Sequence, residues 1–167
     1  MTDKLNKIGL DKKISSDLSD KLNELLANYQ IFYMNARGFH WNIKGEKFFE
    51  LHAKFEELYN DSLVKIDEIA ERILTLRHHP VSRYSDYLEI SKIEESDTLL
   101  EDVEMVETLL SDHGILISKM SHVVKVCENA EDEGTIDLIG AYIRELEKTS
   151  WMLNAWSKNT KKEKATA

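Results

Sequence analysis

Four side chains with metal-binding chemistry recur in one stretch of the chain at helical spacing. His52 and Glu56 are four residues apart, and so are Asp67 and Glu71. At about 100° per residue, the four side chains fall within an arc of roughly 100° on one helix. One imidazole and three carboxylates suit Fe(II), which accepts both nitrogen and oxygen ligands. Acidic residues at this spacing are also common on solvated helix faces, so the pattern by itself leaves both interpretations open.

The two pairs cannot bind one ion within one chain. His52 and Asp67 are separated by fifteen positions, which is roughly 22 Å along a straight helix. If two copies of the helix pack antiparallel about a two-fold axis, His52 of one chain faces Glu71 of the other, and Glu56 faces Asp67. The pattern therefore predicts two equivalent sites in a dimer, each with half of its ligands from each chain. His40 could supply a second imidazole.

Long helices must position these side chains, because residues that break helices are rare. The chain has 167 residues, of which 42% are hydrophobic, with six Gly and one Pro. Apolar residues at spacings of three and four predict four helices. The expected helices cover about 15–43 with Ser15 or Ser16 as N-cap, about 46–77, a third from an N-cap at Asp97 to the acidic stretch 128–133, and about 135–158.

A long connection separates the second helix from the third. It covers residues 78–96 after the single proline, and residues 85–90 within it could form a short helix. The fold class expected is all-α: a ferritin-like four-helix bundle with a long crossover carrying a short helix. Residues 15–158 would form the bundle, and the polar, Lys-bearing segments 1–14 and 159–167 would be flexible tails.

Composition limits the location and the partners. The formal net charge is −9, so the body should repel nucleic acid and attract cations. The N-terminus has no apolar signal segment, no stretch is long enough to span a membrane, and the one cysteine, Cys127, cannot form an internal disulfide. We therefore expect a cytoplasmic protein in which Cys127 is a small buried hydrophobe.

The sequence lacks the iron site that many ferritin-like bundles build inside one chain. That site uses Glu-x-x-His, which places both ligands on one helix face. The residues three positions before the six histidines are Arg37, Phe49, Thr75, Leu76, Leu110 and Lys119. None is Glu. His113 and His122 are nine residues apart, which places them on opposite faces of a helix, so we do not expect them to share a metal. His78 and His79 lie at a helix end before Pro80 and suggest no site.

Residues 39–73 read FHWNIKGEKFFELHAKFEELYNDSLVKIDEIAERI. This stretch resembles the signature of the Dps family, the DNA-binding proteins from starved cells: His-Trp, a following Gly, Phe and Leu-His, then Asp-Glu-x-Ala-Glu-Arg. A weaker resemblance covers all four helices, including Ser150-Trp151-Met152. The ferroxidase ligands that the resemblance implies are His40, His52, Glu56, Asp67 and Glu71. Glu56 stands where many members have Asp.

The resemblance also implies accessory residues and an assembly. Trp41 would lie beside the site and absorb stray oxidising equivalents, and Arg72 would pair with a nearby carboxylate. Family members form hollow dodecamers from two-fold dimers, with acidic pores for iron entry. The matching pore positions are Glu128, Glu133 and Asp137, with Asp132 adjacent. Acidic residues there are also what a helix N-terminus favours.

The function that the resemblance implies is that of a ferroxidase. Fe(II) would be oxidised by hydrogen peroxide, or more slowly by dioxygen, at intersubunit two-iron sites and stored as a ferric mineral, which protects DNA from oxidative damage. DNA-binding members use Lys-rich tails. The candidate contacts are Lys4, Lys7, Lys12, Lys13, Lys158, Lys161, Lys162 and Lys164. Asp3, Asp11 and Glu163 weaken this prediction. The alternatives are a nucleoid protein that compacts DNA with little or no ferroxidase activity, and a plain helical scaffold.

Overall fold

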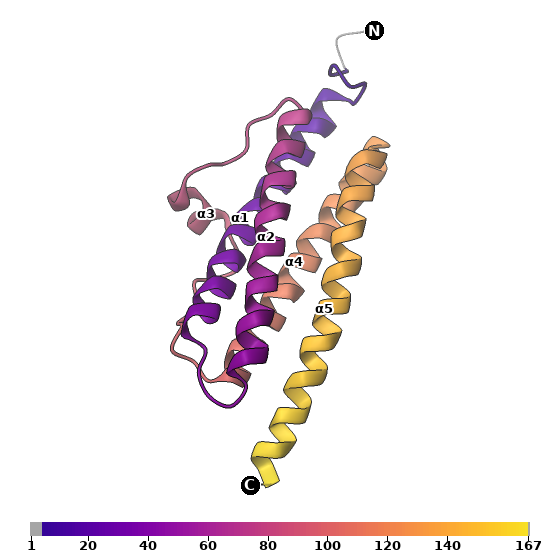
Figure 1. Ribbon diagram of the computed structural model, residues 1–167. Coiled ribbons are helices and arrows are strands. Elements are labelled where there is room, and N and C mark those ends of the chain that lie inside the picture. Colours follow the sequence, from indigo (N-terminus) through magenta and orange to yellow (C-terminus); the bar gives the residue numbers. More distant parts are fainter. Residues whose placement is uncertain (1–4, 167) are drawn as a thin grey trace.

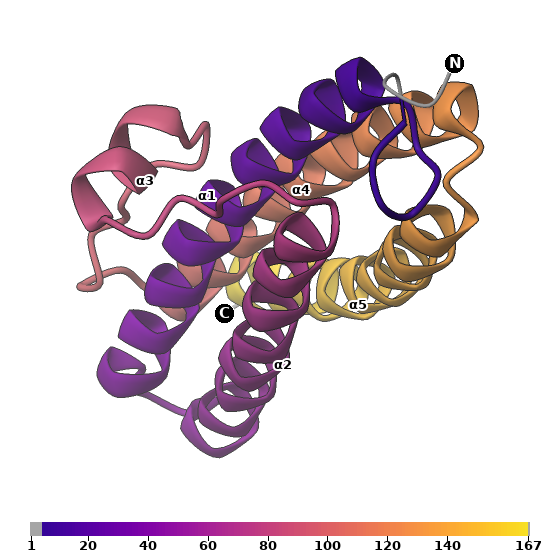
Figure 2. The same cartoon turned by 90° about the horizontal axis from the view of Figure 1, so that it is seen from above.

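The structure is a computed structural model that describes the backbone of residues 5–166 and the side chains of residues 5–158. Its helices are α1 (Lys12–Asn42), α2 (Phe48–Thr75), α3 (Tyr84–Ile90), α4 (Asp102–Ala130) and α5 (Glu133–Thr166). Four of them are long and pack side by side, and the short α3 lies outside them, against α1 (Figures 1 and 2). The expected all-α, ferritin-like bundle with a helix in its crossover is confirmed.

The helices form two closely packed pairs, α1 with α2 and α4 with α5, which are joined mainly by contact between α1 and α4. The crossover runs back along the bundle, so that α4 runs in the same direction as α2 (Figure 1). Backbone contact between α2 and α5 is sparse, and this is therefore the open side of the bundle. In the part of the chain described, no helix has both the length and the apolar character needed to cross a membrane.

Three helix ends differ from the prediction. Asp11 caps α1, because its Oδ1 accepts hydrogen bonds from the backbone N–H groups of Lys13 (2.9 Å) and Ile14 (3.2 Å). Ser15, a predicted cap, is buried inside the first turns and donates to the Leu76 carbonyl at 3.1 Å. At the other end of the chain, α5 continues to Thr166 rather than ending at Lys158.

The third discrepancy is at the start of α4, which begins at Asp102 instead of after Asp97. The Asp97 carboxylate accepts a hydrogen bond from the Leu99 N–H at 2.9 Å, which makes a local turn. Glu101 is the actual N-cap residue, and its own N–H donates to the Glu104 side chain at 3.0 Å. The helix therefore starts four residues later than predicted from Asp97.

Asparagines on α1 hold the crossover in place. The Asn28 Oδ1 accepts from the backbone N–H groups of Lys92 and Ile93, both at 3.0 Å. The Asn35 side chain accepts from the Ser96 N–H at 3.0 Å and donates to the Glu94 carbonyl at 3.0 Å. These bonds satisfy backbone groups of an extended segment that has no sheet partner, and they fix where the crossover lies.

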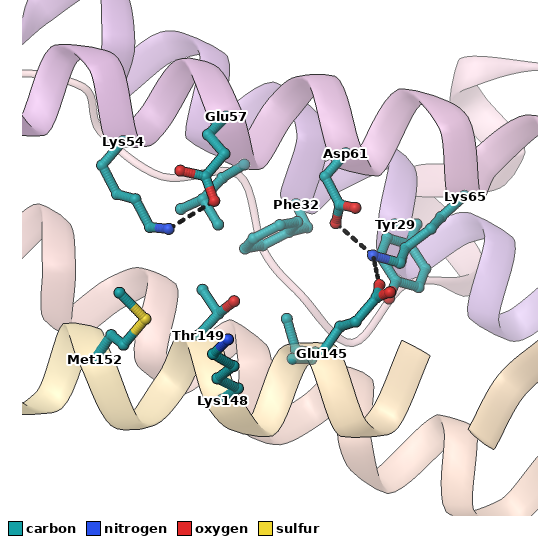
Figure 3. A pocket seen from close by; sticks show the side chains of 12 residues that line it. Tyr29, Phe32, Lys54, Glu57, Asp61, Lys65, Glu145, Lys148, Thr149 and Met152 are labelled. Carbon is teal, nitrogen blue, oxygen red and sulfur yellow. Dashed lines mark hydrogen bonds and ion pairs between the residues drawn. The ribbon is translucent and has the colours of Figure 1, made fainter. Parts of the chain in front are cut away.

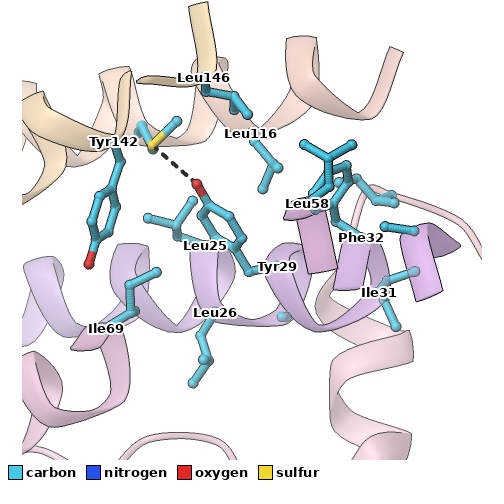
Figure 4. Close-up of a cluster of buried hydrophobic side chains, with 14 of the residues drawn as sticks. Leu25, Leu26, Tyr29, Ile31, Phe32, Leu58, Ile69, Leu116, Tyr142 and Leu146 are labelled. Carbon is cyan, nitrogen blue, oxygen red and sulfur yellow. Dashed lines mark hydrogen bonds between the residues drawn. The ribbon is translucent and has the colours of Figure 1, made fainter. Parts of the chain in front are cut away.

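The core runs along the bundle between the four long helices and contains large apolar side chains. Tyr29 lies at its centre, among Leu25, Phe32, Leu116 and Leu146 (Figure 4). The Tyr29 hydroxyl donates to the Met120 sulfur at 3.8 Å. As predicted, Cys127 is fully buried, and this burial raises the pKa of its thiol to about 12.

Candidate metal centre on the outer face of α2

The two candidate imidazoles come from different helices and lie against each other. His40, near the end of α1, and His52, near the start of α2, have ring centroids 3.8 Å apart and an interplanar angle of 23°. The His40 Nδ1 donates to the His52 carbonyl at 2.8 Å, and the His52 Nδ1 donates to the His40 carbonyl at 2.9 Å. A carbonyl can only accept, so both neutral rings carry their proton on Nδ1. The lone pair is then on Nε2, the arrangement found in metal-binding histidines.

Aromatic rings pack around this pair. Phe48 stacks on His52 with centroids 4.9 Å apart, and Tyr59 meets His40 edge-on at 5.3 Å. The Tyr59 hydroxyl donates weakly to Glu56 at 3.5 Å. Desolvation, and then the Glu56 carboxylate, raise the pKa of Tyr59. Tyr59 was not predicted as a site residue, although its position three residues after Glu56 and seven after His52 places it on the same side of α2.

The carboxylates of Glu56, Asp67 and Glu71 are exposed along one face of α2, as the spacing predicted. Within residues 5–158, no Lys or Arg makes an ion pair with Asp67 or Glu71. In that part of the chain no three His, Cys, Asp or Glu side chains converge where one metal ion could bind. The structure thus brings His40 and His52 together and leaves the second carboxylate pair about four helical turns away on a continuous helix.

Two apolar side chains are exposed between these groups. Leu63 is 51% and Val64 57% exposed, and along the axis of α2 both lie between the two ligand pairs. At about 100° per residue, Leu63 falls within the arc of the ligands and Val64 just beyond the edge of that arc. With Asp67, they line a shallow hollow on α2. Burial of these two side chains would require a second protein, because no segment within residues 5–158 of this chain covers them.

Trp41 is close to the imidazole pair in the sequence but points outward. Its side chain is 61% exposed, and the guanidinium carbon of Arg37 lies 4.9 Å from its ring centroid. Arg37 also donates to the Tyr33 hydroxyl at 2.7 Å. Tyr33 in turn packs edge-on against Tyr59 at 6.0 Å. Aromatic side chains thus extend from His40 along the surface of α1.

Arg72 does pair with a carboxylate, but not with one of the candidate ligands. Its Nη2 lies 2.6 Å from Asp132, and its Nε donates to the Thr135 hydroxyl at 2.8 Å. Asp132 is only 4% exposed and accepts from the Thr135 backbone N–H at 3.1 Å. Burial would raise the pKa of Asp132, but hydrogen bonds from Thr135 and Arg72 lower it overall. Of the four predicted pore acids, Asp132 therefore holds the corner between α4 and α5, whereas Glu128, Glu133 and Asp137 are exposed.

The remaining candidates are scattered. His113 is buried and its Nδ1 donates to the Ser150 hydroxyl at 2.8 Å, whereas His122 is exposed, so the expectation that they face apart is confirmed. Lys7, Lys12 and Arg77 line an open hollow of about 580 Å³ beside the start of α1. Lys13 and Lys158 are exposed. Lys4 lies outside the described residues, as do the side chains of Lys161, Lys162 and Lys164.

Comparison with known proteins agrees with this architecture. A ferritin family profile, described as a ferritin-like domain, matches residues 19–162. The crystal structure of the Dps protein from Vibrio cholerae O1, described as a member of a broad superfamily of ferritin-like diiron-carboxylate proteins, is 48% identical, covers 93% of this chain and 98% of its own, and has a TM-score of 0.90. A DNA protection during starvation protein 2 from Bacillus anthracis is 38% identical over 86% of this chain and 98% of its own length.

A third relative, the DNA protection during starvation protein of Porphyromonas gingivalis, is 37% identical over 89% of this chain and 94% of its own length. The matches cover nearly the whole of the bundle, and they include the stretch of α1 and α2 that carries the candidate ligands. The chain is a member of the Dps family within the ferritin-like superfamily.

Proposed function

We propose that this chain is a ferroxidase that takes up Fe(II) as its substrate at sites shared by two chains. Each site would combine His40, His52 and Glu56 of one chain with Asp67 and Glu71 of the other. The ferric product would be stored inside a closed assembly of two-fold dimers, a dodecamer in the family. The biological role would be detoxification of iron and peroxide, which protects DNA.

The observation that carries the proposal is the reciprocal hydrogen bonding of His40 and His52. Each imidazole is held by the other residue's carbonyl through Nδ1, with Nε2 left as the donor atom for a metal. Fixing the tautomer and the ring orientation in this way is the usual preparation of a histidine ligand.

The exposed carboxylates supply the oxygen ligands that these imidazoles cannot provide. Two neutral rings favour Fe(II), whereas carboxylates also stabilise the harder Fe(III) product. Two Fe(II) ions supply the two electrons that reduce hydrogen peroxide to two water molecules, with uptake of two protons. Two metal ions close together would also limit one-electron reduction of peroxide to hydroxyl radical. The exposed Leu63 and Val64 would then be buried at the two-fold axis that brings the half-sites together.

Iron oxidation in a variant without two of the ligands tests the proposal. Purified wild type and His52→Ala/Asp67→Ala are loaded with Fe(II) without oxygen, peroxide is added, and ferric absorbance is followed. We expect fast oxidation in the wild type and a rate lower by roughly 100-fold or more in the variant, since each site loses one imidazole and one carboxylate. His122→Ala/Glu147→Ala removes the same kinds of side chain from exposed positions elsewhere and should oxidise Fe(II) normally. Equal, slow oxidation in all three proteins would overturn the proposal.

Iron would enter through pores lined by Glu128, Glu133 and Asp137, which are exposed near the start of α5. A ring of such carboxylates concentrates cations by Coulomb attraction. Asp132 would not line these pores, because its carboxylate is already paired with Arg72 and Thr135.

Contact with DNA is a second candidate function, favoured by one observation and by the names of relatives such as the Bacillus anthracis protein. Lys7, Lys12 and Arg77 line one hollow, an arrangement that fits the phosphates of a nucleic-acid backbone. Duplex DNA binding, measured by fluorescence anisotropy at several salt concentrations, tests it. Lys7→Gln/Arg77→Gln should weaken binding and flatten its salt dependence, whereas an unchanged affinity would exclude this hollow.

A further inference from the structure

A groove of about 410 Å³ lies on the open side of the bundle, between α2 and α5 (Figure 3). Two lysines of α2 line it, Lys54 with one carboxylate partner and Lys65 with two. The Lys65 Nζ lies 2.5 Å from an Asp61 oxygen and 3.0 Å from a Glu145 oxygen. The Lys65 side chain is 5% exposed, whereas those of Asp61 and Glu145 are 48% and 58% exposed. The ammonium group is thus buried and its counter-charges face the solvent in the groove.

The surroundings of this ammonium group are those of a bound cation. Besides the two carboxylates, the ring of Tyr142 lies 5.2 Å from Nζ and presents its face to the charge. The Tyr142 hydroxyl donates in turn to Glu68. A lysine is rarely buried to this extent unless its charge is compensated. Here two helices, α2 and α5, contribute acidic groups to one positive charge.

We propose that Lys65 is a built-in counter-ion that excludes divalent metal ions from the α2–α5 groove and thereby determines where on α2 the chain binds them. Because both carboxylate oxygens contact one nitrogen, they converge on one point. Carboxylate oxygens bind Mg²⁺ or Ca²⁺ at about 2.0–2.6 Å, so small side-chain shifts would let an ion replace the ammonium. With Lys65 present, an incoming cation is repelled and finds both carboxylates occupied.

Lys54 in the same groove provides the contrast. Its Nζ lies 2.8 Å from Glu57, the one carboxylate with which it forms an ion pair. Replacing Lys54 would free a single, 67% exposed carboxylate, which by itself is a poor metal site. The exclusion that we assign to Lys65 therefore depends on the convergence of two acidic groups and not on the presence of a lysine in the groove.

Mn(II) is a suitable probe, since it prefers oxygen ligands and the signal of its free aqueous ion can be measured by electron paramagnetic resonance. The titration uses His52→Ala/Asp67→Ala as parent, which removes the proposed iron ligands. We expect Lys65→Met in this parent to bind about one more Mn(II) per chain than the parent does. Adding Glu145→Gln to Lys65→Met should abolish the extra site, and Lys65→Arg, which keeps the charge, should not create it. Lys54→Met is the matched control and should gain no site.

Two results would overturn the proposal: no additional Mn(II) bound by a folded Lys65→Met chain, or an equal gain in Lys54→Met. If Lys65→Met does not fold, Lys65→Gln, which keeps a hydrogen-bond donor, replaces it in the same titration. The inference rests on the proposed function for the identity of the natural cation and for its binding at the His52–Glu71 face of α2. Iron oxidation by the wild type tests that function separately, so the two failures are distinguishable.

Discussion

Two edges of α2 carry similar acidic side chains and differ in where the opposite charge comes from. The helix contains three basic residues, Lys54, Lys65 and Arg72, and each forms an ion pair within the chain. At about 100° per residue, all three fall on one edge, roughly 150° around the helix from the mean direction of the His52–Glu71 face. The opposite edge carries one histidine, His52, and the carboxylates of Glu56, Asp67 and Glu71, but no Lys or Arg.

This difference indicates how one helix can serve both structure and metal binding. On the edge toward α5, the chain itself neutralises the carboxylates, which holds α2 against α5 and the α4–α5 corner. On the other edge, the negative charge is left for an external partner. If the proposed function is correct, that partner is a metal ion together with a second copy of the chain.

The strongest test of this contrast asks whether a second chain supplies the missing metal ligands to the His52–Glu71 face, the unpaired edge of α2. His52→Ala and Asp67→Ala chains should each lose fast Fe(II) oxidation, because both sites of every dimer lack a ligand. Co-expressed in equal amounts, they should recover about a quarter of the wild-type sites, since half of the dimers are mixed and each mixed dimer has one intact site. Ferric absorbance after peroxide addition measures the recovery. Sites contained within single chains would give none.

Val64 lies beside the His52–Glu71 face, between the two ligand pairs along α2, and a charge at this position should prevent assembly. Val64→Asp places a carboxylate near its own copy across the proposed two-fold axis, among the acidic ligands of both chains. We expect the dimer and Fe(II) oxidation to be lost while the helix content is kept, because Val64 is 57% exposed in the single chain. Sedimentation velocity and far-ultraviolet circular dichroism measure the two properties. Ile8→Asp, at an apolar position 43% exposed before α1, is the control; a Val64→Asp protein that still assembles would refute this placement of the axis.

Much of the unpaired edge could be predicted from the sequence, and little of the paired edge could. Helical periodicity placed His52, Glu56, Asp67 and Glu71 on one face, because that relation is local. Arg72 pairs with Asp132, sixty positions away. Helical spacing relates residues of one helix only, so it cannot predict this pair. Lys65 contacts Tyr142 and Glu145, which lie more than seventy positions away, so helical spacing does not identify it as buried.

The helix ends show the same limit on a smaller scale. Several residues with capping side chains lie within a few positions of each start, and a pattern cannot rank them. The buried Ser15 hydroxyl donates to the Leu76 carbonyl, and Asp11 is the residue that caps α1. The Asp97 carboxylate accepts a hydrogen bond within a local turn, and α4 begins only after its N-cap residue, Glu101. In each case a contact with another segment, or a competing local bond, decides the outcome.

The ion pairs of Lys65 and Arg72, on the paired edge of α2, should contribute to stability in a way that depends on pH. Asp132→Asn keeps a capping side chain but leaves the Arg72 charge without its partner, which should cost about 3 kcal/mol, the lower range for a broken buried pair. The folded-state pKa of Asp132 is below its usual value of 3.8, so its contribution is complete above that pH and is lost as the pH falls further. Urea unfolding at fixed protein concentration should show a deficit at pH 7 that shrinks below about pH 4. Asp86→Asn, which breaks the more exposed pair with Arg83, should cost less than about 1 kcal/mol; equal costs would contradict the assigned role.

Asp112 lies on α4, away from both edges of α2, and its replacement has a smaller expected effect on stability than that of Asp132. It is buried with the Asn35 amide as hydrogen-bond donor at 3.2 Å, and burial raises its pKa to about 6. The folded chain therefore takes up a proton between about pH 4 and 6 that the unfolded chain does not, so the contribution of Asp112 falls as the pH rises through this range. Asp112→Asn should be more stable than wild type at pH 7 by on the order of 2 kcal/mol and equal to it near pH 4. His113, whose pKa burial lowers to about 3, is present in both proteins and cancels in the difference. A variant less stable at pH 7 would mean that the Asp112 charge is compensated, as the charges facing α5 are.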